Sequence, residues 1–111
     1  MGSSKPKKTP YLLFSTASNL KEAKKIAKRL IERKLAACVN IIPNLKSYFR
    51  WQGKFDQANE LLLVIKTDKR LLKKVETAIC ELHSYTIPEV IGWQINWGSK
   101  PYFDWLTKST S

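Results

Sequence analysis

The chain has 111 residues, of which 43% are hydrophobic, and its 20 basic and nine acidic residues give a formal net charge of +11. This length favours a single domain with a core of its own. No apolar run approaches the roughly 18–20 residues that cross a bilayer, and the N-terminus lacks the apolar stretch of a secretory signal, so we expect neither a membrane protein nor a secreted one.

The cysteine content and the charge further limit the class of protein and its expected location. Two cysteines, Cys38 and Cys80, are too few for the disulfide framework of a small secreted domain, which favours the cytoplasm. The basic excess is most simply a solvated face that keeps the protein soluble, because many of these residues lie along one expected helix. We do not expect a nucleic-acid partner, since no base-reading groups accompany them.

The first expected elements are a strand and a helix. Pro10–Thr16 is a short apolar run, which is typical of a central strand. Ser18 or Asn19 then caps a helix that ends near Lys34, with Glu22 placed to complete a capping box on Asn19. Apolar residues at three- and four-residue intervals predict the side that faces the core: Leu20, Ala23, Ile26, Ala27, Leu30 and Ile31.

A long β-hairpin should follow. Leu35–Trp51 and Lys54–Lys66 are rich in β-forming residues and fold back on each other at Gln52-Gly53, where the glycine supplies a positive φ. Pro43 cannot donate to a ladder, so we expect a bulge or bend there. The turn sets the register and gives three expected pairs: Trp51 with Lys54, Leu45 with Glu60, and Ile41 with Val64.

The length of this hairpin predicts an oligomer. The arm from Ala36 to Trp51 would span ~50 Å, whereas a compact chain of this size is only about 35 Å across. The hairpin must therefore bend or leave its own globule. Four aromatic side chains would make its tip a large apolar patch in water, so we expect a neighbouring copy to cover them: Tyr48, Phe49, Trp51 and Phe55.

A helix, a strand and a short helix complete the expected chain. Thr67 or Asp68 caps the helix, Ile87–Trp97 alternates as a strand does, and Tyr102–Leu106 predicts a short helical segment. The core side of the first of these helices is expected to hold Leu71, Leu72, Val75, Ala78, Ile79 and Leu82.

This order of elements predicts an α+β fold: a ferredoxin-like βαββαβ sandwich with a long β-hairpin and a short C-terminal helix. Both long helices cover one face of an antiparallel sheet, so the other, partly apolar face again needs a partner. We expect residues 1–9 to be a disordered N-terminal lead, 10–107 to be the single domain and 108–111 to be a polar tail.

Motifs for catalysis are missing from the sequence. It has no nucleophile elbow, glycine-rich phosphate loop, CxxC pair or HExxH, so we do not expect an enzyme. His83 and Cys38 remain as soft metal ligands, which favour copper or zinc. Two alternatives stay open: Cys38 as a small buried hydrophobe, and His83 as a helix-end side chain satisfied by a carbonyl or by Glu89.

Several blocks of the sequence are similar to one known family. They are ERKLAACVNIIP at 32–43, Tyr48-x-x-Trp51-x-Gly53-Lys54, ELLLVIKT at 60–67, Glu81-Leu82-His83-x-Tyr85-x-x-Pro88-Glu89-Val90, and Tyr102-x-x-Trp105-Leu106. Over about Tyr11–Leu106 the chain resembles the CutA family of divalent-cation tolerance proteins. The resemblance implies a ferredoxin-like subunit, a homotrimer held by exchanged strands, and a cytosolic role linked to copper and other divalent cations.

The resemblance also assigns residues. It implies metal binding around His83, and Cys38 matches the family's LAAC block. Ser15 stands where some metal-binding members have a cysteine, Leu82 where some have a histidine, and Ser84 where the family usually has a proline. Three residues match positions that line a cleft between subunits: Tyr85, Glu89 and Lys66. There Tyr85 and Glu89 would supply hydrogen bonds, and Lys66 would bind an anion.

These expectations describe a non-catalytic cytosolic homotrimer for divalent metal ion tolerance, which binds copper or another divalent cation weakly between subunits. The alternative is a PII-like signalling or assembly trimer that binds an anionic metabolite or a partner protein.

Overall fold

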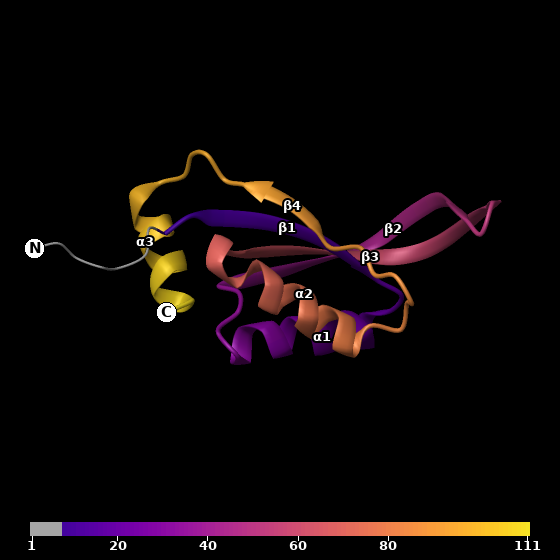
Figure 1. Cartoon of the computed structure of the whole chain (residues 1–111), viewed down its shortest axis with the longest axis horizontal. Coiled ribbons are helices and arrows are strands. Elements are labelled where there is room, and N and C mark those ends of the chain that lie inside the picture. The colour runs from indigo at the N-terminus through magenta and orange to yellow at the C-terminus, as the bar shows by residue number, and fades with distance from the viewer. Residues whose placement is uncertain (1–7) are drawn as a thin grey trace, which may run out of the picture.

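One antiparallel sheet and two helices packed on one of its faces form the body of the protein (Figure 1). This computed structural model describes residues 8–111, so most of the expected lead, residues 1–9, lies outside the described residues. The strand order is β2-β3-β1-β4, which confirms the predicted α+β fold. The elements are β1 (Pro10–Ala17), α1 (Leu20–Glu32), β2 (Cys38–Trp51), β3 (Lys54–Asp68), a 3-10 turn (Lys69–Leu71), α2 (Leu72–Leu82), β4 (Ile91–Gln94) and α3 (Lys100–Ser109). Within the described residues, no helix combines the length and the apolar character needed to cross a membrane.

The capping of α1 differs from the expected capping box. Asn19 is the cap, and its side-chain oxygen accepts a hydrogen bond from the backbone N–H of Glu22 at 2.8 Å. The Glu22 carboxylate, however, accepts from the backbone N–H of Ser18 at 2.9 Å instead of from that of Asn19. The helix ends at Glu32, before the expected end at Lys34, because Lys34 lies in the left-handed region with φ 56°.

The hairpin turn was predicted correctly, and its register only in part. Gln52 and Gly53 both have positive φ, at 52° and 78°, which is the pattern of a type I′ turn. The pairs of Trp51 with Lys54 and of Leu45 with Glu60 are confirmed, but Ile41 pairs with Leu63 and not with Val64. The cause is a bulge at the predicted place, which sets Pro43 and Asn44 opposite the single residue Leu61.

The C-terminal elements differ most from prediction. The strand expected over Ile87–Trp97 is only Ile91–Gln94. Its C-terminal end is set by β1, which begins at Pro10 and whose Pro10 carbonyl accepts the last backbone bond, from Ile95 N–H at 2.9 Å. The helix α3 is longer than the expected Tyr102–Leu106 segment. Thr110, which we placed in a polar tail, is buried, and its carbonyl accepts a hydrogen bond from Arg70 Nη2 at 2.7 Å.

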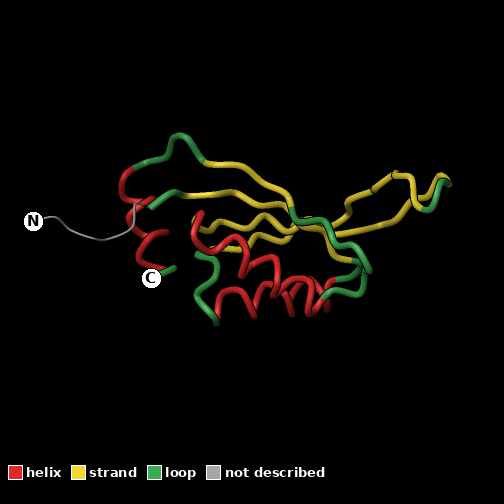
Figure 2. Tube along the Cα trace, in the orientation of Figure 1, coloured by secondary structure: helices red, strands yellow, loops and turns green. Residues whose placement is uncertain are grey.

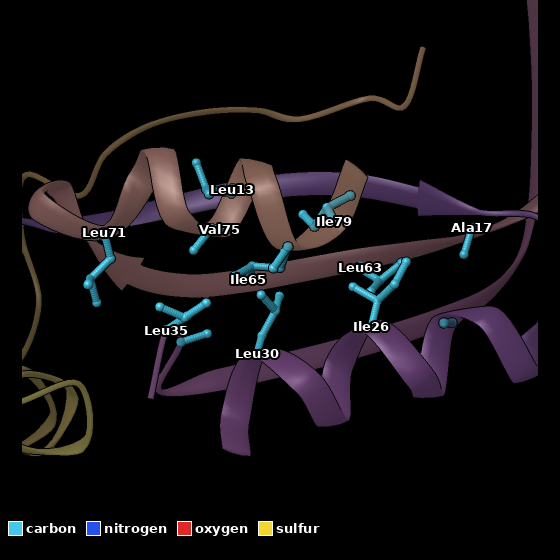
Figure 3. Close-up of a cluster of buried hydrophobic side chains, with 13 residues drawn as sticks. Leu13, Ala17, Ile26, Leu30, Leu35, Leu63, Ile65, Leu71, Val75 and Ile79 are labelled. Carbon is cyan, nitrogen blue, oxygen red and sulfur yellow. The ribbon is translucent and has the colours of Figure 1, made fainter. Parts of the chain in front are cut away.

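The core lies between the helices and the inner face of the sheet (Figure 3). Leu20 and Ile31, which were predicted to face it, are 49% and 43% exposed because they lie on the flanks of α1. Most of the other predicted core positions of the two helices are buried or partly buried. The side chains that meet there include Leu13, Ala17, Ile26, Leu30, Leu63, Ile65, Val75 and Ile79.

One polar side chain lies on this apolar face. Ser15 alternates with Leu13 and Ala17 on β1, so it points to the same side of the sheet. Its side chain is fully buried, and its Oγ has no hydrogen-bond partner among the described residues.

Replacing this hydroxyl should therefore stabilise the protein. We expect Ser15→Ala to raise the free energy of unfolding by about 1 kcal/mol, since an unpaired buried hydroxyl costs more than the small gap its loss leaves. The measurement is urea unfolding at fixed protein concentration. Thr67→Val is the control, because the buried Thr67 Oγ1 donates to the Leu35 carbonyl at 2.6 Å and its loss should destabilise. Equal destabilisation by both changes would contradict the expectation.

The opposite face of the sheet carries a second apolar surface that the helices do not cover. Leu12, Phe14, Leu62 and Val64 alternate with the core residues and are partly exposed. Around them, Ile42, Ile91 and Trp93 are 48%, 57% and 50% exposed. The expected uncovered face is therefore present in the single chain.

The β2–β3 ribbon leaves the globule, as its length predicts (Figure 2). The molecule measures 58 × 26 × 25 Å, and its radius of gyration of 15.4 Å exceeds the ~13 Å of a compact chain this long. At the ribbon tip, Tyr48, Phe49, Trp51 and Phe55 are 65%, 42%, 41% and 72% exposed.

Candidate functional site

A groove of ≈ 750 Å³ lies where the ribbon leaves the globule, between the ribbon and the loop that follows α2. The predicted residues Tyr85 and Glu89 line it together with the tip residues Tyr48, Phe49 and Trp51; Phe55 is not among its lining residues. Its charged lining consists of carboxylates, and within the described residues it includes no lysine or arginine: Asp56, Glu60 and Glu89. In a chain with net charge +11, this groove is a locally acidic surface.

His83 ends α2 and anchors the loop beneath the groove. Its imidazole is fully buried. Nδ1 accepts a hydrogen bond from the Tyr85 backbone N–H at 3.0 Å, so the ring proton is on Nε2, which donates to the Thr16 carbonyl at 2.6 Å. The expected carbonyl partner is present, but the expected alternative partner Glu89 is not. Both ring nitrogens of His83 are therefore occupied within one chain.

Glu22 fastens the same loop to the start of α1. Its carboxylate accepts hydrogen bonds from the backbone N–H and hydroxyl of Ser18, at 2.9 and 2.8 Å, and from the Ser84 backbone N–H at 2.6 Å. Burial alone would raise the pKa of the Glu22 carboxyl, but these bonds outweigh it and lower the pKa to about 2. A proline at position 84, which the family resemblance would place there, has no N–H to donate.

Tyr85 connects the loop to the ribbon. Its hydroxyl donates to Glu60 Oε2 at 2.8 Å, and its ring lies 4.6 Å from that of His83. Burial, the bond to Glu60 and the charges of Glu60 and Glu22 raise the pKa of the Tyr85 phenol to about 12. The phenol therefore stays protonated and acts as a hydrogen-bond donor at neutral pH.

The predicted metal ligands are not brought together in one chain. Cys38 pairs with Lys66 at the far end of β3, while His83 contacts Thr16, which pairs with Leu62. Among residues 8–111, no group of three or more His, Cys, Asp or Glu side chains is placed to hold a metal ion. Ser15 faces the core, and Leu82 packs against it. Within one chain, the residues that the structure describes therefore do not fit a metal centre.

Lys66, the predicted anion-holding residue, also lies away from the groove. It is six positions along β3 from Glu60, or ~20 Å at the usual strand rise. Its Nζ lies 5.7 Å from the centre of the Tyr102 ring. Tyr85 and Glu89 share the groove in one chain, whereas Lys66 can join them only from a neighbouring chain.

Three residues of this site were missed by sequence reasoning: Ser18 as a side-chain donor, Glu22 as its acceptor, and Glu60 as the partner of Tyr85. The pattern at Asn19 and Glu22 did signal a capping interaction, but with Asn19 as the expected partner of Glu22 and not Ser18. Nothing in the sequence pairs Glu60 with Tyr85 or Glu22 with Ser84, because these contacts join residues far apart along the chain.

Comparison with known proteins gives consistent matches. The family model described as CutA1 divalent ion tolerance protein matches residues 11–109. The chain is 43% identical over 99 residues to the divalent-cation tolerance protein CutA of Thermus thermophilus, covering 89% of this chain and 96% of that protein. It is 40% identical over 99 residues to the chloroplastic protein CutA of Arabidopsis thaliana, covering 89% of this chain but only 54% of that longer protein. The crystal structure of CutA1 from Oryza sativa superposes with a TM-score of 0.90 at 38% identity, covering 93% of this chain and 94% of that one.

Proposed function

Because the chain belongs to the CutA1 divalent ion tolerance family, we propose that it acts as a homotrimer that binds copper or another divalent cation weakly where its subunits meet. The observation that carries this proposal is the groove. It gathers carboxylates in a strongly basic chain, beside the apolar tip that a neighbouring subunit would cover.

Two apolar surfaces support the assembly. The uncovered sheet face and the ribbon tip expose large hydrophobic side chains that a neighbouring copy can bury. A cyclic arrangement lets each subunit lend its ribbon to the next, so that the same surfaces are used throughout. The groove, which lies between ribbon and loop, then falls at the boundary between subunits.

The occupied nitrogens of His83 explain why binding would be weak. A metal ion can reach this imidazole only after it gives up its bond to Thr16 or to Tyr85. Cys38 would have to come from another subunit, since the fold keeps it away from His83 in one chain. Groove carboxylates would add oxygen ligands, which do not by themselves select copper.

Three further statements belong to the proposal. We propose binding without catalysis, since the single histidine has no free nitrogen to act as a base. The cytoplasm is the proposed location, supported by two cysteines that are free thiols. A PII-like signalling role is less favoured, because the matched proteins reported above are all named for CutA.

A copper titration tests this function. In a Cys80→Ser background, which removes an exposed thiol, Cu(II) at about a hundredfold its Kd should stabilise the protein by about 2.7 kcal/mol and raise the thermal midpoint. The increment should fall strongly in His83→Gln, which keeps an N–H donor for Thr16 but has no imidazole. The measurement is differential scanning calorimetry, supported by the NMR signals of the His83 ring.

The wild type and His83→Gln are compared by the gain in stability that copper causes in each. Any loss of stability from the substitution itself then cancels. Mg²⁺ at the same concentration is the control for ionic effects. No increment at a stoichiometric excess of Cu(II), or the same increment in His83→Gln, would reject a metal site at His83.

A further inference from the structure

A second hollow, of ≈ 360 Å³, lies on the helical side of the protein, away from the groove and the uncovered sheet face. It is formed where α1 ends and along the outer side of α2. We call it the basic hollow; its lining residues are Arg33, Leu35, Lys73, Lys74, Thr77, Ala78 and Glu81. A hollow of this size is within the range of small-ligand sites.

The charges around the basic hollow favour an anion. Arg33, Lys73 and Lys74 provide three cations against the single carboxylate of Glu81 in the lining. Lys73 is also 3.2 Å from the exposed Glu76, which leaves Arg33 and Lys74 as the stronger candidates for a ligand. Because Lys73 and Lys74 lie in the first turn of α2, the positive end of the helix dipole adds to their field.

The floor of the hollow is apolar and rigid. Leu35 and Ala78 form it, and both belong to the buried core, where Leu35 lies beside Leu30 and Leu71 (Figure 3). The loop between α1 and β2, which carries Leu35, is held by two hydrogen bonds. Leu35 N–H donates to the Leu30 carbonyl at 2.9 Å, and Thr67 Oγ1 donates to the Leu35 carbonyl at 2.6 Å. Arg33 is therefore carried on a backbone that needs little ordering when a ligand binds.

We propose that the basic hollow binds the phosphate groups of a small phosphorylated metabolite. A multiply charged phosphate can compete with Glu81 and Glu76 for the three cations, and the guanidinium of Arg33 matches two of its oxygens. The Thr77 hydroxyl adds a donor, and the apolar floor receives the organic part of the ligand. The concave shape favours a small ligand over nucleic acid, which would contact the protruding lysines of α1 outside the hollow as well. This site does not depend on the proposed cation function, because it uses other residues on the opposite side of the sheet.

Calorimetric titration with inorganic pyrophosphate, at constant ionic strength, tests the proposal. Wild-type protein should bind one pyrophosphate per chain, and Arg33→Gln or Lys74→Gln should each weaken the affinity by about tenfold or more, as expected for a lost charge-assisted bond. Lys24→Gln is the matched control, since it removes the same charge from an exposed position of α1 outside the hollow. It should change the affinity less than about twofold, because an exposed charge acts only weakly at a distance.

Three results would overturn the inference. One is the lack of saturable pyrophosphate binding in the millimolar range. Another is an equal loss of affinity in Lys24→Gln and Arg33→Gln, which would show a diffuse basic surface and not a site. The third is a short DNA duplex that binds with steep salt dependence and loses affinity in Lys24→Gln, which would assign the helical face to a polyanion. None of these results bears on copper binding at His83.

Discussion

Removing the aromatic side chains from the ribbon tip should convert the proposed trimer into a 12.8 kDa monomer. The change is Tyr48→Ser, Phe49→Ser, Trp51→Ser and Phe55→Ser together. Each aromatic side chain that no longer becomes buried in an interface loses roughly 2 kcal/mol, so four of them weaken the assembly by several kcal/mol. Light scattering of the wild type at micromolar concentration should give a mass of about three times that of the chain.

The tip can be changed without touching the core. The core cluster lies under the helices, whereas the ribbon beyond the bulge is paired only within itself. The variant should therefore keep its circular dichroism spectrum while it changes mass. Tyr48 and Phe55 are 65% and 72% exposed although their ring centroids lie 6.1 Å apart, so they should carry the larger share of the loss.

A polar pair on the same ribbon provides the control. Lys46 Nζ donates to Asn59 Oδ1 at 3.3 Å in an exposed cross-strand contact. Replacing both residues by serine should leave the protein trimeric, since an exposed polar contact contributes little. A stable 12.8 kDa particle in the wild type would contradict the assembly. A trimer in the tip variant would contradict the role of the tip in holding it, and with it the argument that the groove lies at a subunit boundary.

The ribbon shows how far local sequence signals reach. Gln52-Gly53 fixes the turn, and each pair follows from it as far as Leu45. Beyond that point, the number of residues that a bulge inserts decides the register, and Pro43 signals a bulge without giving its size. The bulge adds one residue to β2, and every later pair shifts by one.

The ends of β4 depend on a different strand altogether. Ile87–Trp97 alternates as a strand should, but hydrogen bonding stops where β1 stops, at Pro10. On the other side, Ser84 and Tyr85 are bound to Glu22 on α1 and to Glu60 on β3, so the loop before β4 is fixed by contacts outside the β1–β4 ladder. Alternation shows which residues can form a strand, and at this end the neighbouring strand determines where pairing stops.

The candidate site was predictable to the same limited extent. Tyr85 and Glu89 line one groove and His83 contacts Tyr85, because the three residues lie within one short segment. The groove also needs Glu22 and Glu60, which come from other elements and carry no signal that pairs them with this segment. Burial of a carboxylate with several donors is a property of the folded chain alone.

This buried carboxylate gives the second large effect. Glu22→Gln should lower the free energy of unfolding by roughly 3 kcal/mol at neutral pH, as estimated from the fall of its pKa from 4.5 to about 2. The glutamine keeps the shape of the side chain. It cannot, however, accept hydrogen bonds with its amide nitrogen, so a donor of Ser18 or Ser84 is left unpaired. Urea unfolding at fixed protein concentration measures the difference.

The pH dependence distinguishes charge from packing. As the pH falls, the unfolded chain takes up a proton on Glu22 near pH 4.5, and the folded chain only near pH 2. The stabilisation is therefore complete above the higher value and is lost as the pH falls from 4.5 to 2. The difference between the wild type and Glu22→Gln should be constant near neutrality and should shrink across this window.

Glu32→Gln is the matched control on the same helix. Glu32 lies 3.8 Å from Lys28, and the two side chains are 63% and 77% exposed, so its loss should cost less than about 0.5 kcal/mol and show no such window. If the Glu22→Gln difference stayed unchanged down to pH 2, the carboxylate would act through packing alone. In that case its hydrogen bonds to Ser18 and Ser84 could not be what holds the His83 loop in place.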